Sequence, residues 1–346
     1  MNETPVNEFK LGTFEGDGEV FPGAVFGGYV IDLRTVVPGI TRIGDLFADW
    51  DAHLDVIGSL DPAAAGARPL EGLKVHPPVQ PMGTIIAAGA NYREHILQIS
   101  VAHKLGKEGA DAAQLHADAA VETDERGRSG DPYVWTGIPS AVCGAYDDVQ
   151  LPDVGGNVDW ELELGVVIGR KAHRVSAADA YDYVAGYTIV NDVTARTLVP
   201  RGDMAMIGTD WFRAKNQPTF FPTGPYVVPK RFVPDPAKLR ICLSLNGQVM
   251  QDALADDLLF DIPSLIAYAS SVAVLQPGDV LITGSPAGNG SHWGRFLRDG
   301  DVMEAEISGL GIQRSTVRGP SGQLPPWYVD RPKAVAAVAA ATGTGS

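Results

Sequence analysis

The stretch from Val158 to Gly169 constrains the fold most, because its side chains alternate between apolar and acidic with a period of two. Apolar side chains occupy one face of the expected strand, whereas Asp159, Glu161 and Glu163 occupy the other. A strand rises about 3.3 Å per residue, so Glu161 and Glu163 are expected about 7 Å apart on that face. The pattern predicts a core strand that carries adjacent carboxylates.

Adjacent carboxylates repel one another, and a hard cation such as Mg²⁺, Mn²⁺ or Ca²⁺ relieves that repulsion through oxygen ligands. A further acidic candidate, Asp192, ends the apolar segment 186–191 and is followed by Arg196. If Asp192 lies beside the acidic pair, it completes a three-carboxylate metal site. Arg196 then balances the charge or holds a substrate carboxylate. A solvated acidic strand face, and an Asp192 that only caps a turn, are the alternatives left open.

Short strand segments recur from about residue 133 to 317, and the chain's 40 Gly and 25 Pro residues separate them. Asn246-Gly247 lies between two such segments and predicts a type I′ hairpin. Pro277-Gly278-Asp279 predicts a turn that feeds the next strand. Helices are expected from Ser176, through a Ser-x-x-Asp capping box, and from near Pro263. Together these signals indicate an α+β protein that is mainly β.

Composition divides the chain into segments. The first part contains a strand candidate at 24–30 and a helix candidate at 43–57, and the proline-rich run 76–81 is a plausible linker. A polar, weakly periodic stretch after it suggests a long loop or a partly helical flap. The expected segments are a small N-terminal domain (1–78), a catalytic domain (79–320) with a flap or loop insertion at 100–131, and a tail (321–346).

The net charge of −15 argues against a general nucleic-acid or anionic-membrane binder, because both surfaces would repel the chain. No apolar run approaches the roughly 18 residues that span a bilayer, and the first residues lack the pattern of a signal peptide. Cys143 and Cys242 form no C-x-x-C pair, which fits a reducing compartment. We therefore expect a cytoplasmic protein with a small-molecule partner.

Two more segments carry candidate functional residues. His95, in the sequence Asn91-Tyr92-Arg93-Glu94-His95, follows an apolar run and is placed to act as a general base. A single His is more often structural, so this motif alone supports catalysis weakly. The Gly-rich segment 283–290 lets backbone N–H groups approach an anionic oxygen, although a plain tight turn explains it equally well. It lacks the Lys-Ser/Thr ending of a nucleotide-binding loop.

Taken in order, these segments resemble the fumarylacetoacetate hydrolase family. The matching stretches cover about residues 82–318, in the order and spacing of the family. They are NYREH, VDWELELGVVIG, VAGYTIVNDVTAR, the segment from Ala214 to Pro225, LNGQVMQ, LQPGDVLITGSPAG and DGDVMEAEISGLG. The resemblance implies the family's mixed β-roll catalytic domain and a homodimer.

The resemblance also implies that Glu161, Glu163 and Asp192 hold Mg²⁺ or a Mn²⁺-type ion. In the family that ion chelates the two oxygens of a 1,3-dicarbonyl or a 2-oxo acid. Chelation polarises the carbonyls and stabilises the enolate that is released when a C–C bond breaks. The expected substrate is therefore a small oxo acid or diketone.

Other residues match positions around that ion. His95 matches the base that activates water, and Lys215 matches a position near the substrate oxygens. Gln98 stands where family hydrolases carry the Glu that forms a dyad with the His. The residues expected to contact substrate are Tyr92, Arg196 and Ser285.

The chain departs from the family pattern at several of these positions. Glutamine at 98 can orient His95 but cannot take its proton as a carboxylate would. Gly137 falls where many members have the Lys of a Phe-x-Lys motif. Thr197-Leu198-Val199 replaces a common Asp-x-Gln, and Pro218 replaces a common Asp. Substitutes for the missing groups are sought in the 100–131 segment, which offers Glu108, Glu122, Glu125, His103 and His116.

Three functions remain open from the sequence. The leading hypothesis is a metal-dependent hydrolase that cleaves a C–C bond in an acylpyruvate or related β-diketone. The alternative is a decarboxylase, isomerase or hydratase of a 2-oxo acid, which uses the same enolate without attack by water and is favoured by Gln98. A protein that binds an oxo acid or a metal without turnover is the third, and the complete acidic triad argues against it.

Overall fold

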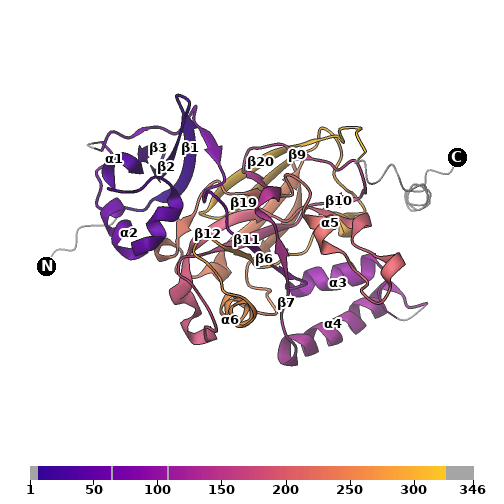
Figure 1. The fold of residues 1–346 in the computed structure, drawn as a ribbon. Helices are drawn as coiled ribbons and strands as arrows, with labels where there is room; N and C mark the ends of the chain where they lie inside the picture. The colour runs from indigo at the N-terminus through magenta and orange to yellow at the C-terminus, as the bar shows by residue number, and fades with distance from the viewer. Residues whose placement is uncertain (1–6, 64, 107–108, 325–346) are drawn as a thin grey trace.

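The structure is a computed structural model that describes residues 7–63, 65–106 and 109–324. Within these ranges a small N-terminal module lies at one end of a larger body of curved sheets, and a pair of helices lies at the other end (Figure 1). Most of the expected tail lies outside the described residues, as does Glu108.

The N-terminal module is an antiparallel sheet with strand order β4-β3-β2-β1-β5. The strand expected at 24–30 is divided, because the chain turns at Gly27-Gly28 between β2 and β3. The helix expected at 43–57 is observed as a 3₁₀ helix followed by α2. The elements are β1 (Lys10–Gly16), β2 (Glu19–Phe26), β3 (Tyr29–Asp32), α1 (Leu33–Val36), the 3₁₀ helix Ile43–Asp49, α2 (Trp50–Gly58), β4 (Arg68–Pro69) and β5 (Lys74–His76).

The main sheet curls into a half-barrel with strand order β7-β6-β18-β11-β12-β14-β8, and β15 adds to β12. Pairs β6–β18 and β8–β14 are parallel, and the other pairs are antiparallel. Its strands are β6 (Ile85–Gly89), β7 (Tyr133–Gly137), β8 (Val142–Gly144), β11 (Leu162–Ile168), β12 (Val184–Asn191), β14 (Phe221–Thr223), β15 (Val228–Pro229) and β18 (Val280–Ile282).

A further sheet of order β17-β16-β19-β20-β9 packs against the main sheet. The predicted hairpin is confirmed, because Asn246 and Gly247 connect β16 to β17 and both have positive φ (53° and 81°), as a type I′ turn requires. Its strands are β9 (Val149–Gln150), β16 (Arg240–Leu245), β17 (Gln248–Leu254), β19 (Val302–Ile307) and β20 (Gly311–Arg318).

The stretch expected as one strand from Val158 to Gly169 is interrupted. β10 (Val158–Asp159) pairs with β13 (Thr194–Ala195), whereas β11 begins at Leu162 in the main sheet. The chain therefore changes partner at residues 160–161, so the break includes Glu161, the first residue of the acidic pair. Periodicity does not reveal this break, because the side chains keep alternating across it.

Two apolar cores lie on opposite faces of the main sheet. Leu162 and Leu164 of β11 belong to a core shared with β16, β19 and α6. Val167 of the same strand belongs to a core shared with the N-terminal module, including Leu11 and Ile31. Because side chains alternate, Glu163 lies on the same face of β11 as Val167. The acidic face of this strand is therefore covered by protein.

The segment expected as a loop or partly helical flap is largely helical. α3 and α4 pack together, and Arg93 at the start of α3 pairs with Asp124 of α4 (2.6 Å). The buried side of α4 consists of Leu115, Ala119 and Thr123, spaced four residues apart, so its small side chains give a weak apolar pattern. The remaining α-helices are α3 (Arg93–Ala102), α4 (Ala112–Ser129), α5 (Trp211–Lys215), α6 (Ile262–Val272) and α7 (Gly290–Trp293).

Short 3₁₀ helices complete the described secondary structure. The Ser176 capping prediction is confirmed, since the Ser176 side chain accepts a hydrogen bond from the backbone N–H of Asp179. The helix predicted near Pro263 is α6, which Asp261 caps. The 3₁₀ helices of this part of the chain are Pro139–Ala141, Ala177–Tyr183, Arg196–Leu198, Gly202–Met204, Lys230–Phe232 and Pro236–Lys238.

Candidate metal centre

Two neighbouring strands bring the three predicted carboxylates together. Glu161 and Glu163 flank the first residue of β11, and Asp192 follows the end of β12, which pairs with β11 through Leu162 and Asn191. The backbone N–H of Asp192 donates to the carbonyl of Glu161 (2.8 Å). One carboxylate oxygen of each acid lies within 4.8 Å of the others, so the three can bind one ion.

The carboxylates are buried: Glu161 is 5% exposed, Glu163 3% and Asp192 2%. The alternative of a solvated acidic strand face is therefore wrong. Asp159 is also fully buried, but it lies outside the ligand group. Keeping four carboxylates away from water is costly unless positive charge lies among them.

Lys215 and Arg196 supply part of this charge. The ammonium of Lys215 contacts the carboxylates of both Glu161 and Asp192. The guanidinium of Arg196 donates to Glu161 (2.6 Å) through Nη2 and to Asp159 (2.8 Å) through Nε. With four acids against two cations, the buried group keeps a formal charge of −2 when all its carboxylates are ionised.

The pKa of Glu161 is lowered, whereas the pKa values of Glu163 and Asp192 are raised. Burial alone would raise the pKa of Glu161, but the charges of Arg196 and Lys215 outweigh it and hold that pKa below its ordinary value. Burial and the charge of Asp192 raise the pKa of Glu163 well above its ordinary value. Burial also raises the pKa of Asp192, to about 7, although Lys215 acts against it. Glu163 and Asp192 are thus the acids whose charge the protein compensates least.

The donor set fits a hard divalent cation. Oδ1 of Asp192 is buried and has no hydrogen-bond partner, which leaves a lone pair for a ligand. A single 2+ ion also matches the uncompensated formal charge of −2. Carboxylate oxygens are the ligands that Mg²⁺, Mn²⁺ and Ca²⁺ prefer. The residues therefore fit the predicted ion, with Glu161, Glu163 and Asp192 as its protein ligands.

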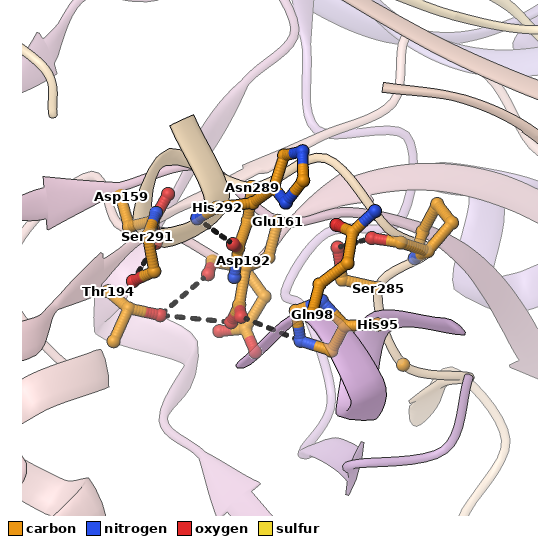
Figure 2. A network of polar contacts seen from close by, with 12 residues as sticks. His95, Gln98, Asp159, Glu161, Asp192, Thr194, Ser285, Asn289, Ser291 and His292 are labelled. Carbon is orange, nitrogen blue, oxygen red and sulfur yellow. Dashed lines mark hydrogen bonds and ion pairs between the residues drawn. The ribbon is translucent and has the colours of Figure 1, made fainter. Parts of the chain in front are cut away.

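His95 lies in the first turn of α3, beside the carboxylates. Its Nε2 is 3.7 Å from Oε1 of Glu161, and its Nδ1 is buried without a hydrogen-bond partner (Figure 2). Burial lowers the pKa of His95 to about 4, although Glu161 acts against it, so the imidazole is neutral near pH 7. Gln98, one turn further along α3, uses Oε1 to accept a bond from the N–H of Gly288 (2.9 Å).

The Gly-rich segment after β18 is fixed to the same strands. The N–H of Gly284 donates to Oε2 of Glu163 (2.7 Å). Gln251 of β17 donates to both Oγ of Ser285 and the carbonyl of Pro286 (2.9 Å each). The segment therefore positions a metal ligand in addition to turning the chain.

Tyr92 and Asp159 are two further buried residues of this region. Tyr92 is fully buried at the start of α3, and burial raises the pKa of its hydroxyl. Asp159 accepts bonds from Arg196 and from the N–H of Trp160 (2.9 Å). It also accepts bonds from the N–H and Oγ of Ser291 (3.2 Å each), which lies beside it in Figure 2. The substrate contacts predicted for Tyr92, Arg196 and Ser285 stay predictions.

Sequence reasoning gave no role to several residues of the centre. Thr194 donates to Glu161 (3.0 Å), and the side chain of Asn191 accepts from the backbone N–H of Glu161 (3.0 Å). Both residues stand within the motif that contains Asp192, so their closeness to Asp192 in the sequence was the one signal that could have pointed to them. Gln251 stands in the LNGQVMQ stretch, which carried no assigned chemistry.

The residues considered as substitutes for the missing groups differ in location. Glu122, Glu125 and His116 are exposed on α4, and Glu125 pairs with Arg128 (2.7 Å). His103, directly after α3, is exposed as well; partial burial and the charge of Arg196 lower its pKa, and Asp159 acts against them. That one of these residues replaces a missing group stays a prediction.

The fold is thus a curled main sheet with three buried carboxylates at its strand ends, placed closely enough to bind a divalent ion. The family model described as Fumarylacetoacetate (FAA) hydrolase C-terminal matches residues 84–318. The chain belongs to the fumarylacetoacetate hydrolase family, as the sequence motifs predicted.

Named relatives span several activities. Oxaloacetate tautomerase FAHD2A, mitochondrial, of Bos taurus is 32% identical over 289 residues, which cover 83% of each chain. The fumarylacetoacetate hydrolase of Exiguobacterium antarcticum superposes with a TM-score of 0.71 at 26% identity, covering 90% of this chain and 99% of that one. Maleylpyruvate hydrolase of Sphingobium sp. SYK-6, solved with manganese(II) and pyruvate, gives 0.67 at 29%, covering 90% and 100%.

These relatives establish that the chain is an enzyme of this family, whose members include hydrolases, tautomerases and isomerases. Among the described residues, no helix is both long and apolar enough to cross a membrane. The homodimer and the cytoplasmic location stay predictions.

Proposed function

We propose that this chain catalyses metal-dependent proton transfer between the keto and enol forms of a small 2-oxo acid. The observation that carries the proposal is the surroundings of His95. Its Nδ1 has no hydrogen-bond partner, and the nearby Gln98 offers an amide, already bonded to Gly288, in place of a carboxylate. The name of the bovine relative, an oxaloacetate tautomerase, supports the same chemistry.

The two reactions require bases of different strength. Water is a very weak acid, so a histidine that activates it gains from a carboxylate partner. A C–H beside a carbonyl of a 2-oxo acid is easier to deprotonate once the developing negative charge is stabilised. When bound, Mg²⁺ or Mn²⁺ supplies that stabilisation by polarising the oxo group. The carboxylate beside His95 is Glu161, at 3.7 Å, and Arg196 and Lys215 already engage that carboxylate. A histidine without a carboxylate partner of its own at position 98 therefore suits enolisation better than water activation.

The protein's own residues supply the remaining steps. We assign to His95 the tautomer whose Nε2–H faces Glu161, which leaves the lone pair on Nδ1 to accept the proton. Lys215 supplies positive charge beside the oxygen that gains negative charge, and Arg196 holds Glu161 in position. Transfer of this proton from His95 to the enolate oxygen gives the enol, and the reverse steps give the keto form, so no C–C bond breaks.

C–C hydrolysis of an acylpyruvate, the leading prediction from sequence, is the second candidate. The observation that favours it is the similarity to maleylpyruvate hydrolase, which was solved with manganese(II) and pyruvate. In this reading His95 removes a proton from water instead of from carbon. Under either candidate function we propose that the protein works in a reducing compartment, in which the free thiols of Cys143 and Cys242 persist.

One experiment separates the two candidates. The protein is incubated with Mg²⁺ and a panel of 2-oxo acids and acylpyruvates while enol absorbance is followed and products are identified by NMR. We expect accelerated keto–enol exchange with no new carboxylic acid. Cleavage of an acylpyruvate to pyruvate and a carboxylic acid, faster than any exchange, contradicts the proposal and supports the hydrolase. Glu161→Gln serves as the inactive control.

A further inference from the structure

We infer that Tyr133, Trp135 and Trp211, called here the aromatic wall, select a 2-oxo acid whose remote end is an aromatic ring and not a carboxylate. This inference rests on the proposed function, since it names the substrate class of the same site. Four observations carry it: the face of the sheet, the contact with Lys215, the exposure of the rings and the pairing of nearby cations.

The aromatic wall lies on the same face of the main sheet as the metal centre. Trp135 and Gly137 are two residues apart on β7 and so share a face. A Cβ at Gly137 would lie 3.2 Å from Cβ of Ile85, which belongs to the same core as Val167. Val167 in turn shares its face of β11 with Glu163. The indole of Trp135 and the carboxylate of Glu163 therefore project to the same side of the half-barrel.

Lys215 connects the aromatic wall to the metal ligands. Its Nζ lies 5.3 Å from the ring centroid of Trp135 and 5.8 Å from that of Trp211. The two indoles are stacked, with centroids 6.2 Å apart and planes 19° apart. The same ammonium contacts Glu161 and Asp192. The aromatic wall thus begins one side chain away from the metal centre.

The rings of the aromatic wall are held in place but not covered. Tyr133 packs against Trp211 (6.3 Å between centroids), and Trp135 packs against Phe221 (6.1 Å). Tyr133 remains 44% exposed, and both tryptophans are half-buried. A substrate ring that packs here covers apolar surface without first ordering side chains, which is the favourable case for binding.

A carboxylate at the remote end of the substrate would find no free cation in residues 196–215, the segment that connects the metal centre to the aromatic wall. All four cations between residues 196 and 215 are engaged by carboxylates or backbone carbonyls: Arg196, Arg201, Arg213 and Lys215. Gly137 has no side chain that could bind a carboxylate. A larger residue does not fit there, because a Cβ would meet the ring of Phe221 at 2.7 Å. A second carboxylate would therefore lose water without gaining an ion pair.

The test compares phenylpyruvate, oxaloacetate and 2-oxobutanoate on the Mg²⁺-loaded protein. Dissociation constants are measured by titration calorimetry, and keto–enol exchange is measured separately. We expect phenylpyruvate to bind about tenfold tighter than oxaloacetate, the difference one aromatic contact can provide. Trp211→Ala should remove this preference, whereas Trp211→Phe, which keeps a ring, should retain most of it. Binding of 2-oxobutanoate, which has no remote ring, should change less than binding of phenylpyruvate in both variants.

A control variant far from the aromatic wall, and the results that would overturn the inference, complete the test. Tyr29→Ala, an exposed aromatic on β3 of the N-terminal module, should leave all three constants unchanged. Tighter binding of oxaloacetate, or an equal loss for all ligands in a folded Trp211→Phe variant, overturns the inference. Preference for phenylpyruvate without exchange of any acid contradicts the proposed function alone. Exchange without aromatic preference contradicts the aromatic wall alone.

Discussion

Replacing Glu163 with glutamine should make the metal-free protein more stable while removing its response to metal. Glutamine keeps an acceptor for the N–H of Gly284, which Glu163 binds at 2.7 Å. It also removes a negative charge from a group in which Asp192 is already poorly compensated. We expect the variant to gain about 2 kcal/mol in the free energy of unfolding in EDTA, a value obtained from two opposing contributions.

The stabilisation gained by removing the charge of Glu163 can be estimated in two ways. Ligand oxygens of Glu163 and Asp192 lie within 4.8 Å, and at an effective dielectric constant of about 20 their repulsion is about 3.5 kcal/mol. If Glu163 takes up a proton instead, holding it at about pH 7 costs about 3.4 kcal/mol relative to the ordinary pKa of 4.5. Against this, a neutral acceptor bonds Gly284 more weakly, by roughly 1 kcal/mol. About 2 kcal/mol remains.

The assay is urea unfolding followed by circular dichroism, in EDTA and in excess Mg²⁺. At one hundred times its dissociation constant the ion should stabilise the wild type by about 2.7 kcal/mol and the variant far less. Glu122→Gln, an exposed change on α4, is the matched control and should stay within about 0.5 kcal/mol of wild type in both buffers. A variant less stable than wild type in EDTA, or one with the full Mg²⁺ response, would refute the reasoning.

Three other predictions follow from the same centre. Gln98→Glu adds a second carboxylate near His95, besides Glu161, and should raise acylpyruvate cleavage at least several-fold in the product assay; unchanged cleavage argues against a missing dyad. Asp159→Asn loosens Arg196 and should weaken Mn²⁺ binding about 10- to 100-fold by calorimetry, with no effect expected if Asp159 is only a fold anchor. The pKa of Asp192 is raised to about 7, so the folded chain binds this proton more tightly than the unfolded chain does. Stability in EDTA should therefore rise from about pH 8 to about pH 5, and a fall over that range contradicts the assignment.

The sequence predicted that the three carboxylates lie together because their signal is local. Glu161 and Glu163 stand two residues apart in a strand pattern, and Asp192 ends the next apolar strand of the same motif series. Strand pairing then brings them together, as antiparallel neighbours must. The hairpin at Asn246-Gly247 was predictable for the same reason, since its turn chemistry lies in two adjacent residues.

Long-range features were not predictable in this way. The pairing of Arg196 with Asp159 joins β10 to the residue after β13, and no periodicity records it. α4 was uncertain because its buried side uses Ala119 and Thr123 in place of large apolar residues. The aromatic wall joins Trp135 to Trp211 across 76 positions of sequence, and only the fold brings the two rings together.

The central claim is that Glu161, Glu163 and Asp192 bind one divalent ion. Anomalous diffraction from crystals soaked in Mn²⁺ tests it most directly. The account predicts one strong peak about 2.0 to 2.6 Å from a carboxylate oxygen of each residue, the range of hard-cation–oxygen distances. A peak elsewhere, or none here while the ammonium of Lys215 still bridges Glu161 and Asp192, would contradict it.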